Sequence, residues 1–279
     1  MKKLLLGLIG GGIQRSLSPF VHEEEGRHHG LRVHYQLIDL DAAGVGNEAL
    51  PGLIGAARVM GFAGLNVTFP CKQAVIPLLD ELSAEARAIG AVNTVVRDGA
   101  RLIGYNTDGS GWSWGFRRAL PGADLSRVVL LGAGGAGSAC ADAVLRLGAA
   151  QLLIFDRDAP RAAELAARLN HHLPGERARS SGDLAAALAG ASGLIHATPT
   201  GMAKIPGMPL PEALLRASLW VSEVVYVPLE TELLRAARRR GYKTMDGGHM
   251  NVGQALGAFK LFTGLEPDAE RMMRHFKSL

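Results

Sequence analysis

The chain has 279 residues, a length that suits one large domain or two smaller ones. Hydrophobic residues make up 48% of it and charged residues 20%, which is typical of soluble globular proteins and excludes a disordered or fibrous chain. The 30 Lys and Arg exceed the 26 Asp and Glu only slightly, so the net charge of +4 does not indicate a nucleic-acid binder. No apolar run reaches the roughly 18 residues of a membrane span.

Apolar runs of strand length alternate with helical patterns along the whole chain. These runs cover residues 4–10, 33–40, 64–67, 91–96, 128–131, 152–156, 193–198 and 220–224. The alternation predicts an α/β fold with parallel sheets built from βαβ units. Polar motifs precede the segment 108–126 and a glycine-rich signature follows it, so we expect a domain boundary there.

The glycine-rich signature comes directly after the apolar run 128–131. Gly132, Gly134 and Gly137 have the spacing G-x-G-x-x-G, and a helical pattern over residues 140–147 follows them. In a dinucleotide-binding fold the first glycine permits a tight turn, the second lets a pyrophosphate approach, and the third lets the helix pack closely on the strand. The segment therefore predicts a Rossmann domain.

The next apolar run ends at Asp156, where a Rossmann domain places the acidic residue that binds the adenosine ribose. A carboxylate there repels the 2′-phosphate of NADP by about 1 kcal/mol or more, and Asp158 adds to this repulsion. Arg157 points the other way, because a guanidinium beside the ribose binds a 2′-phosphate or stacks on adenine. On balance the sequence favours NAD, with NADP less favoured.

Four polar segments lie in the first third of the chain, near the ends of expected strands. Hydroxyls, amides, one lysine and one aspartate recur in them, which is what a polyhydroxylated anion needs for many directional hydrogen bonds. The segments are Ser16-Leu17-Ser18-Pro19, Asn66-Val67-Thr68-Phe69-Pro70-Cys71-Lys72, Asn93-Thr94 and Gly104-Tyr105-Asn106-Thr107-Asp108.

Together with the glycine loop and the segments 197–202, 223–226 and 246–254, these motifs resemble the shikimate dehydrogenase family, in its NAD-dependent quinate/shikimate dehydrogenase branch. The motifs follow the family's order over nearly the whole chain. The resemblance implies an N-terminal α/β substrate-binding domain over residues 1–108, completed by 249–279. It implies a Rossmann NAD-binding domain over 109–248, C-terminal helices that pack back on the first domain, and an active site between the domains.

The chemistry implied by the resemblance is the reversible oxidation of a ring hydroxyl of shikimate or quinate to the 3-dehydro acid, with NAD as hydride acceptor. Lys72 and Asp108 match the family's catalytic pair. A lysine with an ordinary pKa of about 10.4 is a poor base near neutrality, so we assign the proton jointly to the pair. Lys72 transfers the proton, and Asp108 binds the reacting hydroxyl and orients the lysine.

The resemblance also implies which residues bind the two ligands. Those expected at the substrate are Ser16, Ser18, Asn66, Thr68, Lys72, Asn93, Asp108, Tyr226 and Gln254. Those expected at the cofactor are Gly132, Ala133, Gly134, Gly135, Ala136, Gly137, Asp156, Arg157, Thr198, Val224 and Gly247. For Ser16 and Ser18 the alternative is that they cap the helix before Pro19.

Three positions depart from the usual pattern of the family. This chain has His196-Ala197-Thr198 where relatives often read Asn-Ala-Thr, and Gly248-His249 where they often have Leu-Gly. It has Asp156-Arg157-Asp158 where NADP-dependent members commonly read Asn-Arg-Thr. His249 is either a packed residue or one that changes substrate preference.

Other functions stay open at this point. The fold is compatible with a dehydrogenase of a related cyclic hydroxy acid such as an aminoshikimate, or with a non-catalytic NAD and metabolite sensor. No motif indicates a metal site, a nucleic-acid partner or a membrane partner. Cys71 and Cys140 are the only cysteines, too few for a disulfide framework, so the chain is expected in the reducing cytoplasm. It is expected to be a monomer or a homodimer. Its pathway is expected to be the shikimate pathway of aromatic amino acid biosynthesis, or quinate metabolism.

Overall fold

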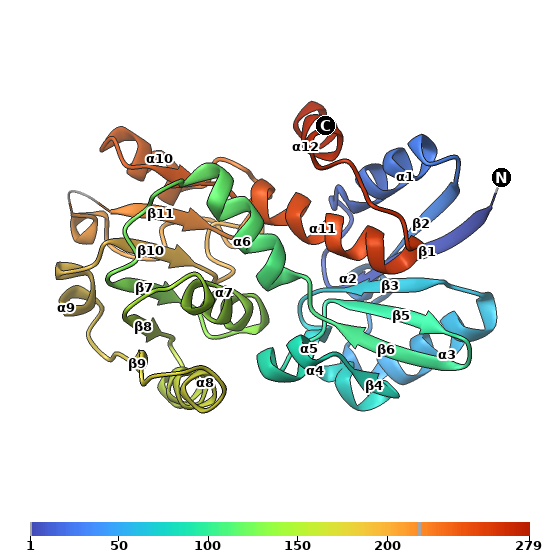
Figure 1. Ribbon diagram of the computed structural model, residues 1–279, viewed down its shortest axis with the longest axis horizontal. Helices are drawn as coiled ribbons and strands as arrows, with labels where there is room; N and C mark the ends of the chain where they lie inside the picture. Colours follow the sequence, from blue (N-terminus) through green and yellow to red (C-terminus); the bar gives the residue numbers. More distant parts are fainter. Residues whose placement is uncertain (1, 217–218) are drawn as a thin grey trace. The chain divides into compact units, whose positions relative to one another are not determined.

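The computed structural model describes residues 2–216 and 219–279, and the chain has an α/β fold (Figure 1). It forms two compact units. The first unit holds the residues up to Thr107 together with Gln254–Leu279, and the second holds Asp108–Gly253. The domain boundaries expected from the sequence, 108/109 and 248/249, lie within a few residues of these two boundaries, 107/108 and 253/254.

The sheet of the first unit is mostly parallel, as the alternation of strands and helices predicts, with one exception. Among the described strands of this sheet, β5 runs antiparallel to both of its neighbours. The reason is local: β5 and β6 are joined by two residues, with Gly99 at φ +62°, and strands joined by so short a turn must run in opposite directions. The strands lie in the order β2-β1-β3-β5-β6-β4, with bounds β1 Lys3–Gly10, β2 Arg32–Asp39, β3 Gly64–Val67, β4 Glu81–Leu82, β5 Thr94–Asp98 and β6 Arg101–Tyr105.

Helices cover both faces of this sheet, so the interior strand β1, which lies between β2 and β3, is apolar almost throughout. Leu6 and Leu8 belong to one core with Phe262 of α11, and Ile9 belongs to the opposite core. Glu25 of α1 binds Arg271 of α12 at 2.6 Å, which confirms that the C-terminal helices pack on the first unit. The helices are α1 Ser18–His28, α2 Leu40–Ala43, α3 Leu50–Met60, α4 Cys71–Ala74, α5 Ala84–Ile89, α11 Gly247–Thr263, which begins in the second unit, and α12 Ala269–Ser278.

The second unit is a Rossmann fold, as the glycine signature predicts. Its sheet is entirely parallel, and the strand order reverses at β7, as in other dinucleotide-binding domains. The strands lie in the order β12-β11-β10-β7-β8-β9, with bounds β7 Val128–Leu131, β8 Leu152–Phe155, β9 Ala178–Ser180, β10 Gly193–His196, β11 Trp220–Glu223 and β12 Thr244–Met245.

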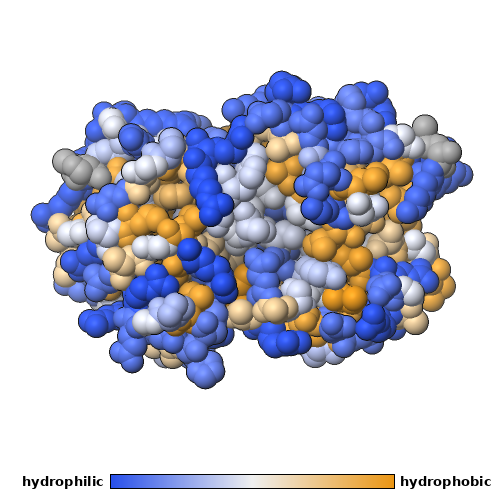
Figure 2. Space-filling view, viewed as in Figure 1, coloured by the Kyte–Doolittle hydropathy of each residue, from blue (hydrophilic) through white to orange (hydrophobic). Residues whose placement is uncertain are grey.

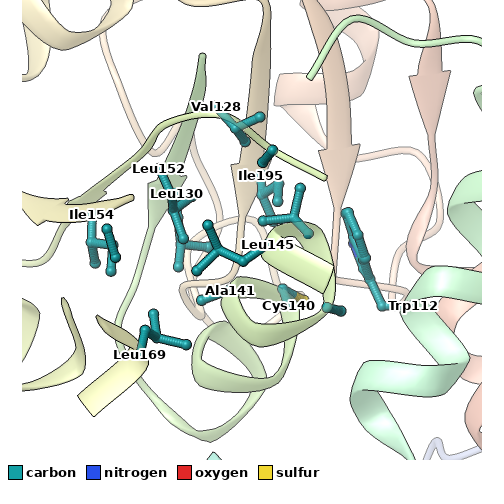
Figure 3. Packing of buried hydrophobic residues seen from close by; sticks show 14 of the residues in the cluster. Trp112, Val128, Leu130, Cys140, Ala141, Leu145, Leu152, Ile154, Leu169 and Ile195 are labelled. Atoms are coloured by element: carbon teal, nitrogen blue, oxygen red, sulfur yellow. The ribbon is translucent and has the colours of Figure 1, made fainter. Parts of the chain in front are cut away.

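Two apolar cores stabilise this second sheet, one on each face. Leu130 faces the core that contains Trp112 of α6 and Leu145 of α7 (Figure 3), and the neighbouring Val129 faces the other core. On the molecular face shown in Figure 2, hydrophobic residues are exposed in patches between hydrophilic ones. The helices are α6 Asp108–Ala119, α7 Gly135–Arg146, α8 Ala159–His172, α9 Leu184–Ala189 and α10 Glu232–Arg239. Across the described ranges, none of the helices has the length and apolar character needed to cross a bilayer.

His22 of α1 makes the first unit sensitive to acid. It is 1% exposed, stacks on Tyr35 with ring centroids 5.0 Å apart, and its Nδ1 has no hydrogen-bond partner among the described residues. Burial lowers the pKa of His22 to about 4, although the nearby Glu25 carboxylate opposes this. The unfolded chain therefore binds a proton below about pH 6.5 that the folded chain does not bind, so stability is lost as the pH falls toward 4.

We expect this single group to remove up to about 3 kcal/mol of unfolding free energy between pH 7 and pH 4. Urea unfolding at several pH values measures the loss in the wild-type protein, in His22→Phe and in the control His34→Asn, an exposed residue of the same unit. The loss should be smaller in His22→Phe and unchanged in the control. Equal acid sensitivity in all three proteins would contradict the assignment.

Candidate active site

The ends of several strands meet at one edge of the first sheet. Since β3 and β6 each pair antiparallel with β5, they run in the same direction, and β5 begins at the edge where they end. β1 pairs parallel with β3 and therefore also ends there. The topology thus brings to one edge residues that are far apart in the sequence, namely those after β1, β3 and β6 and those before β5.

Asn93 is the centre of a hydrogen-bond network at this edge. The backbone N–H of Thr107 donates to Asn93 Oδ1 at 2.8 Å, which fixes the orientation of the amide. Asn93 Nδ2 then donates to Thr107 Oγ1 at 2.9 Å and to Gln254 Oε1 at 3.1 Å. With its oxygen occupied in this way, Gln254 has its Nε2 available as a donor. Asn93 is 2% exposed, so it acts mainly by holding its neighbours.

Asn66 stands behind this network. Its Nδ2 donates to the carbonyl of Asn93 at 3.2 Å and to Thr94 Oγ1 at 3.0 Å, and its Oδ1 accepts from the hydroxyl of Tyr35 at 2.7 Å. Tyr35 was not predicted. The available signal was a lone tyrosine in the strand 33–40, which its spacing alone does not distinguish from a core residue.

The loop after β1 carries Ser16 and Ser18. The hydroxyl of Ser16 donates to Ser18 Oγ at 3.1 Å, and Ser16 is 5% exposed. Leu17, and neither serine, is the N-cap of α1, but Ser16 Oγ accepts from the backbone N–H of Ser18, the first residue of the helix, at 3.3 Å. The capping alternative therefore holds in part for Ser16. Asp39, which was not predicted, fastens this loop by accepting from the backbone N–H groups of Gly12 at 2.8 Å and Ile13 at 3.0 Å.

The charge on Asp39 supports this role. Burial alone would raise the pKa of its carboxyl, but hydrogen bonds from backbone N–H groups, led by Gly12, hold that pKa below its usual value. A carboxylate that is ionised and fully hydrogen-bonded keeps the loop in one conformation. Thr68 lies beside the same loop, since a Cβ on Gly10 would come within 2.3 Å of its methyl carbon.

Lys72 and Asp108 belong to different units. Lys72 is half-buried on α4, and its carbonyl accepts from the N–H of Val92 at 2.8 Å, which ties the short helix to the segment before Asn93. Asp108 is the first residue of α6, directly after Thr107, and is 1% exposed. Burial raises the pKa of the adjacent Cys71 thiol to about 11, which disfavours the reactive thiolate and supports a structural cysteine.

The glycine loop of the second unit has the backbone geometry that a pyrophosphate requires. Gly132 has φ +100°, and a Cβ on it would lie 2.7 Å from the carbonyl oxygen of Ala197. A Cβ on Gly137 would lie 1.9 Å from the carbonyl oxygen of Gly132. Gly134 is the N-cap of α7 and is open, since the nearest atom to a Cβ there is Nη2 of Arg161 at 3.6 Å. The loop and the helix N-terminus therefore fit a dinucleotide. Gly135 and Ala136 form the first turn of α7.

Asp156 lies beside this loop, at the end of β8. Its carboxylate accepts from the N–H of Ala133 at 2.7 Å and from the N–H of Asp158 at 3.0 Å, and it keeps lone pairs for a further donor. Arg157 is exposed. Arg161, which was not predicted, is a second guanidinium near the loop. The sequence signal for Arg161 is its position one helical turn after Asp158.

The remaining predicted cofactor residues follow β10 and β11. Thr198 is half-buried two residues after β10, and Val224 comes directly after β11. A Cβ on Gly247 would lie 2.4 Å from the carbonyl oxygen of Val225, so a larger residue at that position would displace the loop. Tyr226, predicted at the substrate, is half-buried on the same loop of the second unit.

His249 is packed within the second unit. Its Nδ1 lies 2.9 Å from Asp246 Oδ1, and a Cβ on Gly115 of α6 would come within 2.9 Å of its Cβ. Burial would raise the pKa of Asp246, but the hydrogen bond from His249 holds that pKa below its usual value. Of the two readings of His249, these contacts favour the packed one. Within residues 2–216 and 219–279, no group of His, Cys, Asp and Glu is arranged to hold a metal ion.

Comparison with known proteins agrees with this architecture. Residues 8–95 match a family model described as the shikimate dehydrogenase substrate binding domain. Shikimate dehydrogenase (NADP(+)) of Streptomyces avermitilis is 56% identical over 99% of this chain and 95% of its own length. Quinate/shikimate dehydrogenase (NAD(+)) of Corynebacterium glutamicum is 46% identical over 99% of each chain. The structure of quinate dehydrogenase from Corynebacterium glutamicum in complex with NAD matches with a TM-score of 0.91, at 44% identity over 100% of both chains.

Relatives of this identity and coverage place the chain in the shikimate dehydrogenase family. It is an oxidoreductase whose cofactor is a nicotinamide dinucleotide. The family resemblance found in the sequence is thereby confirmed. The relatives differ in the dinucleotide they are named for, one with NADP(+) and another with NAD(+).

Proposed function

We propose that this protein catalyses the reversible oxidation of a ring hydroxyl of shikimate, quinate or both to the 3-dehydro acid. The observation that carries the proposal is the hydrogen-bond network around Asn93, which arrays amide and hydroxyl groups at one edge of the first sheet. Such an array suits a small polyhydroxylated ligand with little apolar surface. In this proposal the first unit binds the acid and the second binds the dinucleotide.

The reaction needs a group that removes the proton of the substrate hydroxyl. Lys72 and Asp108 take this role jointly: Lys72 transfers the proton, and Asp108 hydrogen-bonds the hydroxyl and orients the lysine. The sheet topology supports the assignment, because Lys72 follows β3 and Asp108 follows β6, two strands that end at the same edge. When bound, the nicotinamide supplies the acceptor for the hydride.

The substrate carboxylate and the other ring hydroxyls are bound by neutral groups. Ser18 donates its hydroxyl hydrogen to the carboxylate, and Ser16 joins it by rotating its own hydroxyl hydrogen from Ser18 Oγ to the carboxylate. Gln254 supplies its Nε2, because Asn93 already occupies its oxygen. Thr68, Asn93 and Tyr226 complete the set, with Asn66 holding Asn93 in place. Neutral donors bind a carboxylate without a full counter-charge.

Steady-state rates with a panel of cyclic hydroxy acids test this function. Shikimate and quinate, each with NAD and with NADP, should give absorbance from the reduced nicotinamide in at least one combination. An aminoshikimate in the same panel tests for a related substrate. A protein that binds the dinucleotide but turns over none of these acids would instead be a sensor, and the proposed reaction would be rejected.

We further propose that NAD is the preferred dinucleotide. Asp156 and Asp158 place two carboxylates at the end of β8, where the 2′-phosphate of NADP would bring a like charge, at a cost of about 1 kcal/mol or more. The guanidinium groups of Arg157 and Arg161 oppose this preference. In this proposal the negative charge of Asp156 outweighs the two guanidinium groups. Its hydrogen bond with the N–H of Ala133 at 2.7 Å holds the carboxylate against the phosphate-binding loop.

Replacing Asp156 with asparagine should therefore shift the cofactor preference. Asparagine keeps an acceptor for the N–H of Ala133 but removes the charge, so the ratio of kcat/KM for NAD to that for NADP should fall by about tenfold, which corresponds to about 1.4 kcal/mol. The matched control is Asp183→Asn, since Asp183 caps α9 and asparagine caps a helix equally well. An unchanged ratio in Asp156→Asn would reject the role of this carboxylate.

A further inference from the structure

A buried acid–imidazole–hydroxyl chain connects the loops that follow β10 and β11. His196, the last residue of β10, and Glu223, the last residue of β11, have fully buried side chains, and His196 Nδ1 lies 2.8 Å from Glu223 Oε1. On the other side of the ring, His196 Nε2 lies 2.6 Å from Thr198 Oγ1. The three side chains form a continuous row in the core of the second unit.

The partners of Glu223 determine where the hydrogens lie. Its Oε1 also accepts from the backbone N–H groups of Val224 at 2.9 Å and Val225 at 3.0 Å, and its Oε2 accepts from the hydroxyl of Thr231 at 3.0 Å. A carboxylate with these three donors only accepts, so the contact with His196 Nδ1 requires that this nitrogen carries a hydrogen. In the neutral ring Nε2 is then an acceptor, and the hydroxyl of Thr198 must donate to it.

This arrangement sets the polarity of Thr198. With its hydrogen directed at His196, and with the N–H of Thr200 3.3 Å away, the hydroxyl of Thr198 can only accept a hydrogen bond from any further partner. Buried carboxylates fix the tautomer and orientation of histidine in the same way in Ser-His-Asp triads. The same row of contacts holds the loops after β10 and β11 together.

Thr198 faces the dinucleotide loop. A Cβ on Gly132, the first glycine of that loop, would lie 3.0 Å from the methyl carbon of Thr198. We propose that His196 is a positioning residue for the dinucleotide, because it presents the Thr198 hydroxyl as a hydrogen-bond acceptor to an N–H or O–H group on the nicotinamide riboside half. This proposal rests on the proposed function, since it assumes that a dinucleotide binds the second unit.

The polarity argument is tested by binding, independently of turnover. NADH and NADPH are titrated into the protein, and the change in protein fluorescence gives the Kd of each. Thr198→Val, which cannot accept, should bind the preferred dinucleotide about tenfold more weakly, and so should His196→Phe, which removes the group that orients Thr198. The double variant should be no weaker than either single variant, because both substitutions remove the same interaction.

A merely structural role for His196 predicts different results. If His196 acts by positioning Thr198, the KM for the acid at saturating dinucleotide should change less than twofold in the variants. If His196 instead has a general structural role, its replacement should raise this KM as well. The matched control is His172→Phe: His172 pairs with Asp142 at 2.8 Å in the same unit but lies between α7 and α8, so its dinucleotide Kd should be unchanged. If His196→Phe does not fold, His196→Leu serves in the same cycle, and Thr198→Ser should bind like the wild-type protein.

Two outcomes would overturn the inference. In the first, the wild-type protein binds NADH or NADPH and the His196 and Thr198 variants bind it equally well. In the second, the effects of the two substitutions add in the double variant. If the wild-type protein binds neither dinucleotide, the proposed function fails as well, and that result is distinct from both of these.

Discussion

Replacing Lys72 with alanine should lower kcat by about 10²–10⁴-fold, which is the usual contribution of a positioned general acid or base. The substitution removes the group that transfers the hydroxyl proton but leaves the network around Asn93 in place. Binding of shikimate or quinate, measured by calorimetry, should therefore change far less than turnover does. Turnover is measured as steady-state rates over a range of pH and is compared with these binding constants.

The control for this experiment is Lys277→Ala, because Lys277 is an exposed lysine on α12 with no part in the site. It should retain the wild-type rate. If Lys72→Ala keeps its rate to within tenfold, Lys72 is not the proton-transfer residue. In that case a different group must remove the hydroxyl proton.

Replacing Gly137 with alanine should have the largest structural effect in the second unit. The new Cβ would lie 1.9 Å from the carbonyl oxygen of Gly132, a backbone atom that cannot move without displacing the dinucleotide loop. Overpacking of this kind costs about 1–3 kcal/mol of stability, and displacement of the loop should raise the Kd for NADH by more than tenfold. Thermal unfolding and fluorescence titration measure the two effects.

Gly182→Ala is the matched control, because a Cβ on Gly182 would meet no atom within 4 Å and this glycine lies in the same unit. Both its Tm and its NADH affinity should match the wild-type values. Should Gly137→Ala bind NADH normally, the close packing at Gly137 would not matter for the dinucleotide, and the role assigned to this glycine would be wrong.

The Rossmann unit was predictable from its sequence because its signals are local. The spacing of Gly132, Gly134 and Gly137 reflects contacts among neighbours in one turn: Gly137 packs on Gly132, and Gly134 caps α7. Asp156 is similarly close, since it bonds the N–H of Ala133 from the next strand. The apolar runs around these residues mark strands that are buried on both faces.

The first sheet was harder to predict because the direction of a strand leaves little trace in an apolar run. The pattern over residues 91–96 does not show that β5 reverses direction. That reversal depends on the turn at Gly99, which joins β5 to β6. The strands β4 and β12 have two residues each, too few for any periodicity.

Side-chain networks were the least predictable part of the site. His196 and Glu223 are 27 residues apart, and Tyr35 and Asn66 are 31 apart, so each pair meets only after the sheet has assembled. The sequence marked His196 as unusual through its departure from the family pattern, but gave no indication of its partner. The assembled fold, and not the local sequence, determines that the side chains of His196 and Glu223 are buried together.

The first unit is discontinuous in the chain, since it is closed by Gln254–Leu279 after the whole second unit has intervened. Phe262 fills the space above Gly64, and Arg271 neutralises the buried Glu25. A ribosome therefore releases the complete Rossmann unit before the N-terminal sheet receives its last covering helices. Until then Leu6 and Leu8 lack the contacts that Ala258 and Phe262 make with them in the folded protein, so this core is among the last parts of the molecule to be completed during synthesis.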